Sequence, residues 1–118
     1  MLDTVAPQML SVDHPSPFMT FTFDVKEGWA ERVPEVVHED GTARAQVLKR
    51  DYNPRYYDLM KELEVMTGNG VVLNTSLNRR GEPMVCSPTD ALNMFFGSDL
   101  QFLIMEDILV MKARDGGN

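Results

Sequence analysis

A polar loop that follows a short apolar run carries the side chains best suited to chemistry. The apolar run covers 70–73, and a strand that ends in polar residues and glycine is a typical place to hold a small polar ligand. Hydroxyl, amide and guanidinium groups can all hydrogen-bond to an oxyanion. The candidate binding residues of this loop are Asn74, Ser76, Asn78, Arg80 and Gly81. Their types and spacing predict a site for an anion or a nucleotide.

A second polar cluster lies earlier in the chain. The turn dipeptide Asp40-Gly41 leads into a predicted strand that begins at Thr42 and carries Arg44. Because a guanidinium again follows a tight turn, this cluster supports the same prediction of anion or nucleotide recognition.

Each cluster also has an interpretation that needs no ligand. Asn74, Ser76 and Asn78 can hydrogen-bond to their own backbone in a turn, and Arg44 can be a solvated residue on an edge strand. The lone Cys86 precedes a predicted helix, where a cysteine is most often a small buried side chain. The sequence leaves the turn-only and the ligand-binding interpretations of the polar residues open.

The composition argues against several classes of protein. The chain of 118 residues has 11 basic and 18 acidic residues, and its net charge of −7 argues against binding to nucleic acid or to an anionic membrane. A single cysteine cannot form an internal disulfide, and no sustained apolar block provides a secretory or membrane segment. We therefore expect a cytoplasmic protein. No His, Cys or carboxylate spacing resembles a metal site, so we expect no metal within this chain. No P-loop motif occurs, which argues against a P-loop enzyme.

Two helices are predicted from their caps and their periodicity. The first covers 54–67, with Asn53 as its N-cap and Gly68 as its left-handed end. The second runs from Pro88 to about Phe96, because Ser87 to Asp90 resembles a capping box.

Short apolar and alternating runs predict the strands. They cover 18–25, 42–49, 70–75, 102–105 and 108–111, and 29–33 forms either a short helix or a turn. We expect 1–17, which contains three prolines, to be an irregular lead-in and 113–118 to be a flexible tail. The order of elements predicts an α/β protein of the α+β type, with an open twisted mixed sheet and helices packed on one face.

Several short motifs are spread over most of the chain. They are Ala6-Pro7, Ser16-Pro17-Phe18-Met19, His38 to Arg44, Asn53-Pro54, Thr67-Gly68, Asn74 to Asn78, Gly81-Glu82-Pro83 and Pro88 to Ala91. Through these motifs the chain resembles the C-terminal part of the O-carbamoyltransferase family, which includes nodulation and antibiotic-tailoring enzymes. The resemblance implies that 18–112 is part of a YrdC-like domain.

In that family the YrdC-like domain uses ATP and carbamoyl phosphate to make carbamoyl adenylate. A separate metal-bearing acceptor domain, in cis or in trans, then passes the carbamoyl group to a hydroxyl. The resemblance therefore implies ATP as a substrate, with Mg²⁺ accompanying it, and a role in carbamoyl transfer. Catalysis would rest on positioning and on charge neutralisation.

The resemblance also implies roles for individual residues. Arg44 would hold phosphate or carbamoyl oxygens, since a guanidinium presents a fixed fork of donors. Ser76 and Asn78 resemble the Ser-x-Asn signature of YrdC-like domains and would contact the adenylate, with Asn74 beside them. His38 and Asp40 would support their loop.

The chain departs from the family pattern in two ways. Leu77 stands where the family has an aromatic residue, and the family's Lys-x-Arg element lies upstream of the first motif found here. We therefore expect a domain truncated at its N-terminus, inactive alone and self-associating as a homodimer. The alternative function is a non-catalytic module on the same fold that binds nucleotides or another protein.

Overall fold

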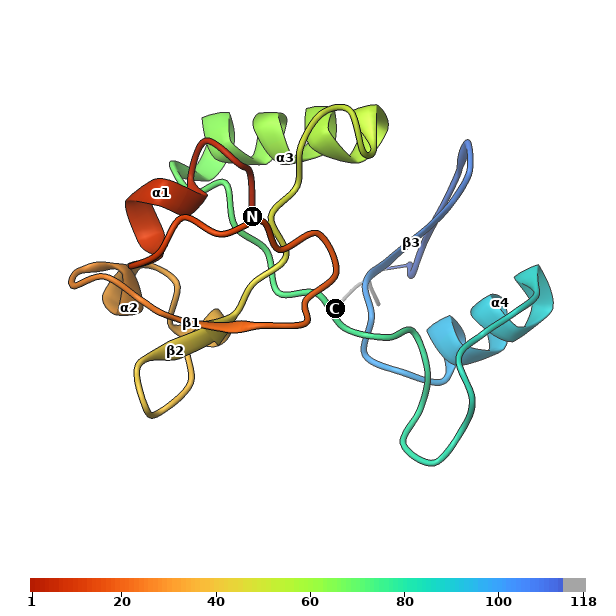
Figure 1. The fold of residues 1–118 in the computed structure, drawn as a ribbon. Helices are drawn as coiled ribbons and strands as arrows, with labels where there is room; N and C mark the ends of the chain where they lie inside the picture. Colours follow the sequence, from red (N-terminus) through yellow and green to blue (C-terminus); the bar gives the residue numbers. More distant parts are fainter. Residues whose placement is uncertain (114–118) are drawn as a thin grey trace, which may run out of the picture. The chain divides into compact units, whose positions relative to one another are not determined.

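The computed structural model describes residues 1–113 of the chain (Figure 1). It divides into two compact units, Met1–Leu73 and a second that begins at Asn74. Residues 114–118, which belong to the predicted flexible tail, lie outside the described residues. Since each unit has a core of its own, the two are described separately.

Unit 1 combines helices with a small antiparallel sheet. Its elements are α1 (Ala6–Met9), β1 (Thr22–Asp24), α2 (Trp29–Arg32), the 3-10 helix η1 (Pro34–Val36), β2 (Thr42–Arg44) and α3 (Pro54–Thr67). In Figure 1, α3 and the β1–β2 pair lie on opposite sides of this unit. β1 and β2 pair with Phe23 opposite Ala43, and both of these side chains are buried.

The N-terminal segment contributes more to the core than the predicted irregular lead-in implies. It contains α1, and Leu2, Val5, Met9 and Leu10 are all buried. Their apolar side chains recur at a spacing that one short helix can present to the core, and the proline falls in its first turn, where it is tolerated. The segment is therefore part of the packed unit and not only an approach to it.

Helix α3 forms as its caps predict. The Asn53 side chain accepts a hydrogen bond from the Tyr56 N–H at 3.1 Å, and Gly68 has a φ of +75° and donates to the Glu64 carbonyl at 2.8 Å. Met60 is the buried residue of the helix. The predicted helix over 54–67 is confirmed.

Unit 2 consists of α4 (Pro88–Phe96) and a hairpin of β3 (Phe102–Met105) and β4 (Ile108–Met111). Ser87 caps the helix by accepting from the Asp90 N–H at 3.1 Å. The buried core of this unit is small and consists of Ala91, Phe95 and Leu103. The predicted second helix is confirmed, and so are the strands predicted over 102–105 and 108–111, which pair with each other.

The predicted strand over 70–75 is wrong, and this changes the sheet. These residues are coil, and Leu73 is 65% exposed. A strand needs a neighbouring strand with which it exchanges a series of backbone hydrogen bonds. This segment instead accepts a hydrogen bond from the Leu2 N–H at the Gly70 carbonyl.

The α+β class with open sheets is confirmed, but its strands form two separate two-stranded antiparallel sheets, β1–β2 and β3–β4, in place of one mixed sheet. The strands predicted over 18–25 and 42–49 are shorter than expected. No helix within residues 1–113 is both long and apolar enough to cross a membrane.

Candidate functional site

The Asp40-Gly41 dipeptide forms a tight turn that leads into β2. The Gly41 N–H donates to the His38 carbonyl at 3.0 Å, and the His38 N–H donates to the Thr42 carbonyl at 2.7 Å. Gly41 has a φ of +80°, which a side chain would strain. A turn followed by a left-handed residue is a common short hairpin connection. The predicted turn is confirmed, and so is the start of a strand at Thr42.

Side chains within this turn hold each other in place. The Asp40 carboxylate accepts from the Thr42 hydroxyl at 2.7 Å and from the Thr42 N–H at 3.0 Å. Because the hydroxyl donates its proton to Asp40, the His38 Nδ1 that lies 3.1 Å from the Thr42 oxygen is the donor of that contact. The Thr42 hydroxyl, and to a smaller extent its N–H, hold the pKa of Asp40 below the usual range. Asp40, Gly41 and Thr42 therefore build a rigid support for the start of β2.

We expect Thr42→Val to raise the pKa of Asp40 toward its ordinary value, because the hydroxyl that stabilises the carboxylate is lost. The folded pKa is lower than the unfolded one, so the contribution of Asp40 to stability is complete above the unfolded pKa of 3.8 and disappears as the pH falls through the folded pKa. NMR titration of the Asp40 carboxyl measures the shift, and Thr42→Ser is the control that keeps the hydroxyl. Equal pKa values in Thr42→Val and the unchanged chain would contradict this account of the turn.

Arg44 follows this support on the exposed face of β2. Its Cα pairs with that of Thr22 on β1, and the preceding Ala43 is buried. Within residues 1–113 no hydrogen bond or ion pair occupies the Arg44 guanidinium. Its N–H donors are therefore available to an anion. A solvated arginine that binds no ligand would have the same geometry, so both interpretations of Arg44 fit the structure.

The predicted binding loop of unit 2 is held together by its own side chains. The Ser76 hydroxyl donates to Asn78 Oδ1, and Asn78 Nδ2 donates to the carbonyls of Arg79 at 3.1 Å and Glu82 at 3.0 Å. Gly81 has a φ of +84° in a turn that the Glu82 N–H closes on the Arg79 carbonyl at 3.0 Å, as a type II turn requires. The Asn78 amide thus shapes the loop, as the turn-only interpretation predicts.

Other groups of the same loop remain accessible. Ser76 is exposed, and its oxygen keeps lone pairs that can accept a further hydrogen bond. Arg80 is exposed and has no ion pair within residues 1–113. Asn74 is also exposed, at the beginning of unit 2. The loop therefore presents a hydroxyl and a guanidinium around a rigid turn.

Arg79 is an anchor of this loop that the sequence reasoning missed. Its Nη2 donates at 2.9 Å to the carbonyl of Asn93 near the C-terminal end of α4, where the helix dipole favours a cation. A Cβ on Gly97 would lie 1.6 Å from that nitrogen, so the glycine leaves the space that the guanidinium occupies. The sequence shows a glycine directly after the predicted helix, but no pattern in the sequence indicates that the Arg79 side chain fills the space beside it.

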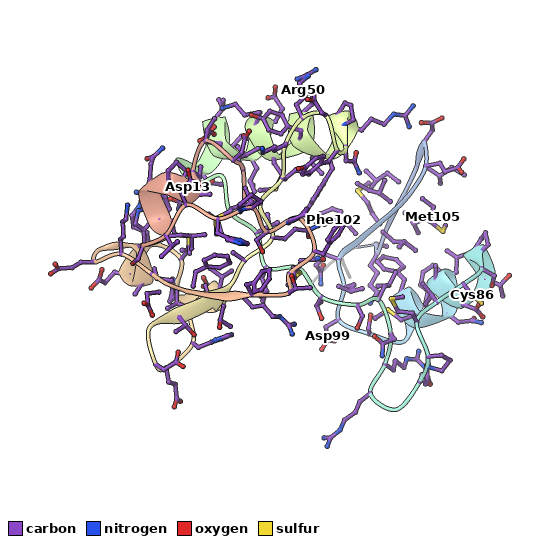
Figure 2. The ribbon with its side chains drawn as sticks, viewed as in Figure 1. Asp13, Arg50, Cys86, Asp99, Phe102 and Met105 are labelled. Atoms are coloured by element: carbon purple, nitrogen blue, oxygen red, sulfur yellow. The ribbon has the colours of Figure 1, made fainter. Side chains whose placement is uncertain are left out.

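Cys86 is exposed, so the expectation of a buried side chain is wrong (Figure 2). It lies just before the N-cap of α4, outside the small core of unit 2. Its thiol lies 3.4 Å from Asp90 Oδ2, and this hydrogen bond to a carboxylate raises the pKa of Cys86. A raised pKa keeps the thiol protonated, which does not suit a nucleophile. Within residues 1–113 no group of three or more His, Cys, Asp or Glu side chains could hold a metal ion.

The structure thus places the predicted site residues in two groups. Asp40, Gly41, Thr42 and Arg44 form one, on the turn and strand of unit 1. The other group is in unit 2 and contains Asn74, Ser76, Asn78, Arg80 and Gly81. Each group combines a hydrogen-bonded turn with an exposed arginine, in a protein of the α+β class.

Comparison with known proteins identifies the family. Residues 1–112 match the family model described as Carbamoyltransferase C-terminus, and the chain belongs to that family. The resemblance inferred from the sequence motifs is therefore confirmed.

Curated relatives share this region but are much longer. The chain is 41% identical to the uncharacterized protein MJ1051 of Methanocaldococcus jannaschii, over 84% of this chain and 19% of that protein. It is 34% identical to the uncharacterized protein sll1178 of Synechocystis, over 86% of this chain and 20% of that protein. It is 38% identical to the nodulation protein NolO of Bradyrhizobium diazoefficiens, over 81% of this chain and 18% of that protein. The chain spans about a fifth of the length of these relatives.

Proposed function

We propose that this chain contributes to the site at which a carbamoyltransferase forms carbamoyl adenylate from carbamoyl phosphate and ATP. The observation that carries the proposal is Arg44, an exposed guanidinium that no hydrogen bond or ion pair occupies within residues 1–113. It follows a hydrogen-bonded turn, in a chain of the carbamoyltransferase C-terminus family. A guanidinium can neutralise phosphate oxygens as charge moves onto the leaving pyrophosphate.

The chemistry asked of the chain is positioning and charge neutralisation. Carbamoyl phosphate would first react with water to give carbamate, with inorganic phosphate as the leaving group. A carbamate oxygen would then bond to the α-phosphorus of ATP as the bond to pyrophosphate breaks and pyrophosphate leaves. In unit 1, Arg44 would bind phosphate or carbamoyl oxygens, and Mg²⁺ would accompany ATP. In unit 2, Ser76 and Arg80 are by themselves a second set of groups that could bind such oxygens. A metal-bearing acceptor domain, in cis or in trans, would then transfer the carbamoyl group to a hydroxyl. The exposed free thiol of Cys86 fits a reducing, cytoplasmic location.

The test is pyrophosphate release by a complete carbamoyltransferase that contains this domain. ATP, Mg²⁺ and carbamoyl phosphate are supplied together, and each is omitted in turn. Release that requires carbamoyl phosphate supports adenylate formation. Nucleotide binding without release of pyrophosphate would favour the alternative, a non-catalytic nucleotide-binding module. If the protein neither binds nucleotide nor releases pyrophosphate, a protein-interaction module is favoured. The Asn78 loop, whose amide hydrogen-bonds within the loop, is also consistent with such a module.

Ser76→Ala is expected to weaken ATP binding about tenfold, the effect of one lost hydrogen bond to a charged ligand. The melting temperature should stay unchanged, because Ser76 is exposed and its bond to Asn78 can be replaced by water. Calorimetric titration and thermal melting are measured on the same complete protein, with Thr89→Ala as the control, an exposed hydroxyl on α4. Loss of cooperative folding in place of a binding defect would show that Ser76 serves the turn alone.

We also propose that the chain self-associates through the outer face of its C-terminal hairpin. The register places Phe102 opposite Met111 and Ile104 opposite Leu109, and each of these side chains is more than half exposed. The other face of the hairpin packs on α4 through Leu103. An apolar face of this kind can pair with its own copy about a two-fold axis.

Ile104→Asp is expected to convert a dimer of the isolated chain into a monomer, because it buries a carboxylate in that interface. Sedimentation velocity measures the change, and Val65→Asp is the control at a residue of α3 that is 80% exposed. A monomer before any substitution, or a dimer that Ile104→Asp leaves intact, would refute the proposed interface.

A further inference from the structure

The segment that follows α3 contains an asparagine directly before a glycine. Among the asparagines of the chain, Asn69 alone precedes a glycine. The backbone nitrogen of the next residue can attack an asparagine side chain, and a glycine shields its own nitrogen least because it has no Cβ. Asparagine is already one of the chemically labile residue types, so the dipeptide Asn69-Gly70 is a candidate for loss of ammonia.

The backbone at this position is open to such an attack. Helix α3 ends at Gly68, so Asn69 lies outside the helix, and its side chain is only half buried. Within residues 1–113 no hydrogen bond occupies the Gly70 N–H. An amide within a helix would first have to break its hydrogen bond, whereas the Gly70 nitrogen has none to break.

The Arg32 guanidinium holds the group that would be attacked. Its Nη2 donates to Asn69 Oδ1 at 2.8 Å and to the Gly68 carbonyl at 3.1 Å. The guanidinium in turn packs on the ring of the buried Trp29, with its carbon 4.1 Å from the ring centroid. Attack on the side-chain carbonyl places negative charge on Oδ1, and a cationic donor that is already in position stabilises this charge. Arg32 therefore both orients and polarises the Asn69 amide.

We propose that Asn69 is a modification site at which the chain loses ammonia and acquires an isoaspartate. Solvent base removes the Gly70 N–H proton, the Gly70 nitrogen bonds to Cγ of Asn69, and the bond from Cγ to the amide nitrogen breaks as ammonia leaves. Water then opens the cyclic imide that results. Opening at Cγ gives aspartate, and opening at the backbone carbonyl carbon gives isoaspartate, in which the main chain runs through Cγ. The net reaction consumes one water, releases ammonia and leaves a carboxylate.

The isoaspartate product conflicts with the packing around Gly70. The Leu2 N–H donates to the Gly70 carbonyl at 3.0 Å. A Cβ on Gly70 would lie 2.8 Å from Leu2 Cδ1 and 2.9 Å from Val5 Cγ2, so only a glycine fits here. An isoaspartate lengthens the main chain between α3 and this contact by one atom, which displaces Gly70 from Leu2. Because the core is close-packed, the N-terminal segment then loosens from unit 1.

The aspartate product keeps the native backbone. Its carboxylate accepts from Arg32 as the amide oxygen does, and this contact becomes an ion pair. Asn69→Asp is therefore the matched control, since it introduces the same charge without the added main-chain atom.

Mass spectrometry tests the site on the unmodified 118-residue chain. After incubation at mildly alkaline pH, the peptide that contains Asn69 should lose its amide before those that contain Asn78 or Asn93. An isoaspartyl methyltransferase with a labelled methyl donor should label the aged chain and not aged Asn69→Gln. Amide loss that begins at another asparagine, or an aged chain that takes up no label, would overturn the inference without depending on any variant.

The rate of amide loss tests the part assigned to Arg32. Arg32→Ala should slow the reaction at Asn69 about tenfold, the effect of one lost charge-assisted hydrogen bond in the transition state. Arg32→Lys should keep part of the rate, because an ammonium also donates and carries the charge. An equal or faster reaction in Arg32→Ala would refute the role of Arg32.

Thermal melting separates the two products. The chain prepared by chemical ligation with isoaspartate at position 69 should melt roughly 4–8 °C below the unchanged chain, with faster hydrogen exchange at the Leu2 N–H. Asn69→Asp should melt with the unchanged chain. Equal melting temperatures of the isoaspartate form and Asn69→Asp would show that the added main-chain atom does not disturb the Gly70 contact, and would refute the proposed loosening.

Discussion

Arg44→Ala is expected to lower pyrophosphate release by a complete carbamoyltransferase that contains this domain by about 10²–10³-fold, the typical loss when one preorganised donor to a developing charge is removed. The guanidinium lies on the exposed face of β2 and has no ion pair within the described residues. Surface substitutions of this kind change stability by less than about 0.5 kcal/mol, so the melting temperature should barely move. The effect should therefore appear in turnover and not in folding.

A matched arginine provides the control for this experiment. Arg55 is exposed in the first turn of α3 and has no ion pair within residues 1–113, so Arg55→Ala removes the same charge outside the candidate site. Arg44→Lys should restore only part of the rate, because an ammonium cannot reproduce the two-pronged contact of a guanidinium. Unchanged turnover in Arg44→Ala, or an equal loss in Arg55→Ala, would remove Arg44 from the site.

Phe95→Ala is expected to unfold unit 2, with a loss of about 3–5 kcal/mol. Phe95 is 0% exposed, and its buried neighbours in this core are Ala91 and Leu103. The other large side chains packed against this core, among them Leu77, Leu92 and Met105, are only partly buried, so Phe95 supplies most of its buried volume. Because Arg79 anchors the polar loop to α4, loss of the helix should also release the loop that carries Ser76.

The adjacent Phe96 is the control, because its ring is 63% exposed and packs edge to face on Phe95 at 5.2 Å. Phe96→Ala should cost less than about 1.5 kcal/mol, the worth of one aromatic pair. Hydrogen exchange followed by NMR reports each unit separately, and amides of α3 in unit 1 should keep their protection. Comparable losses for the two phenylalanines would show that the core of unit 2 is not centred on Phe95.

Local signals in the sequence predicted the elements whose ends are set by local chemistry. Asn53 and Gly68 bound α3, and Ser87 caps α4, because a cap satisfies backbone groups within a few residues of itself. The hairpin of β3 and β4 is also local, since its strands are separated by Glu106 and Asp107 alone. The Asp40-Gly41 turn belongs to the same class of signal.

Features that need a distant partner were predicted poorly. The apolar run 70–73 is typical of a buried strand, but no strand within residues 1–113 pairs with it, and Leu73 is exposed. The segment 1–17 was expected to be an irregular lead-in, yet it supplies Leu2 and Met9 to the core of unit 1. Apolarity shows that a residue favours burial, but it does not show which surface will cover it.

The candidate site divides in the same way. By itself, the sequence determined which residue types could meet an anion and which turns carry them, because Asp-Gly and Arg-Gly dipeptides specify backbone geometry locally. Only the tertiary structure decided that Arg79 binds the end of α4 and that Asn78 is used within its own loop. These contacts depend on register and packing between segments far apart in the chain, which no local pattern specifies.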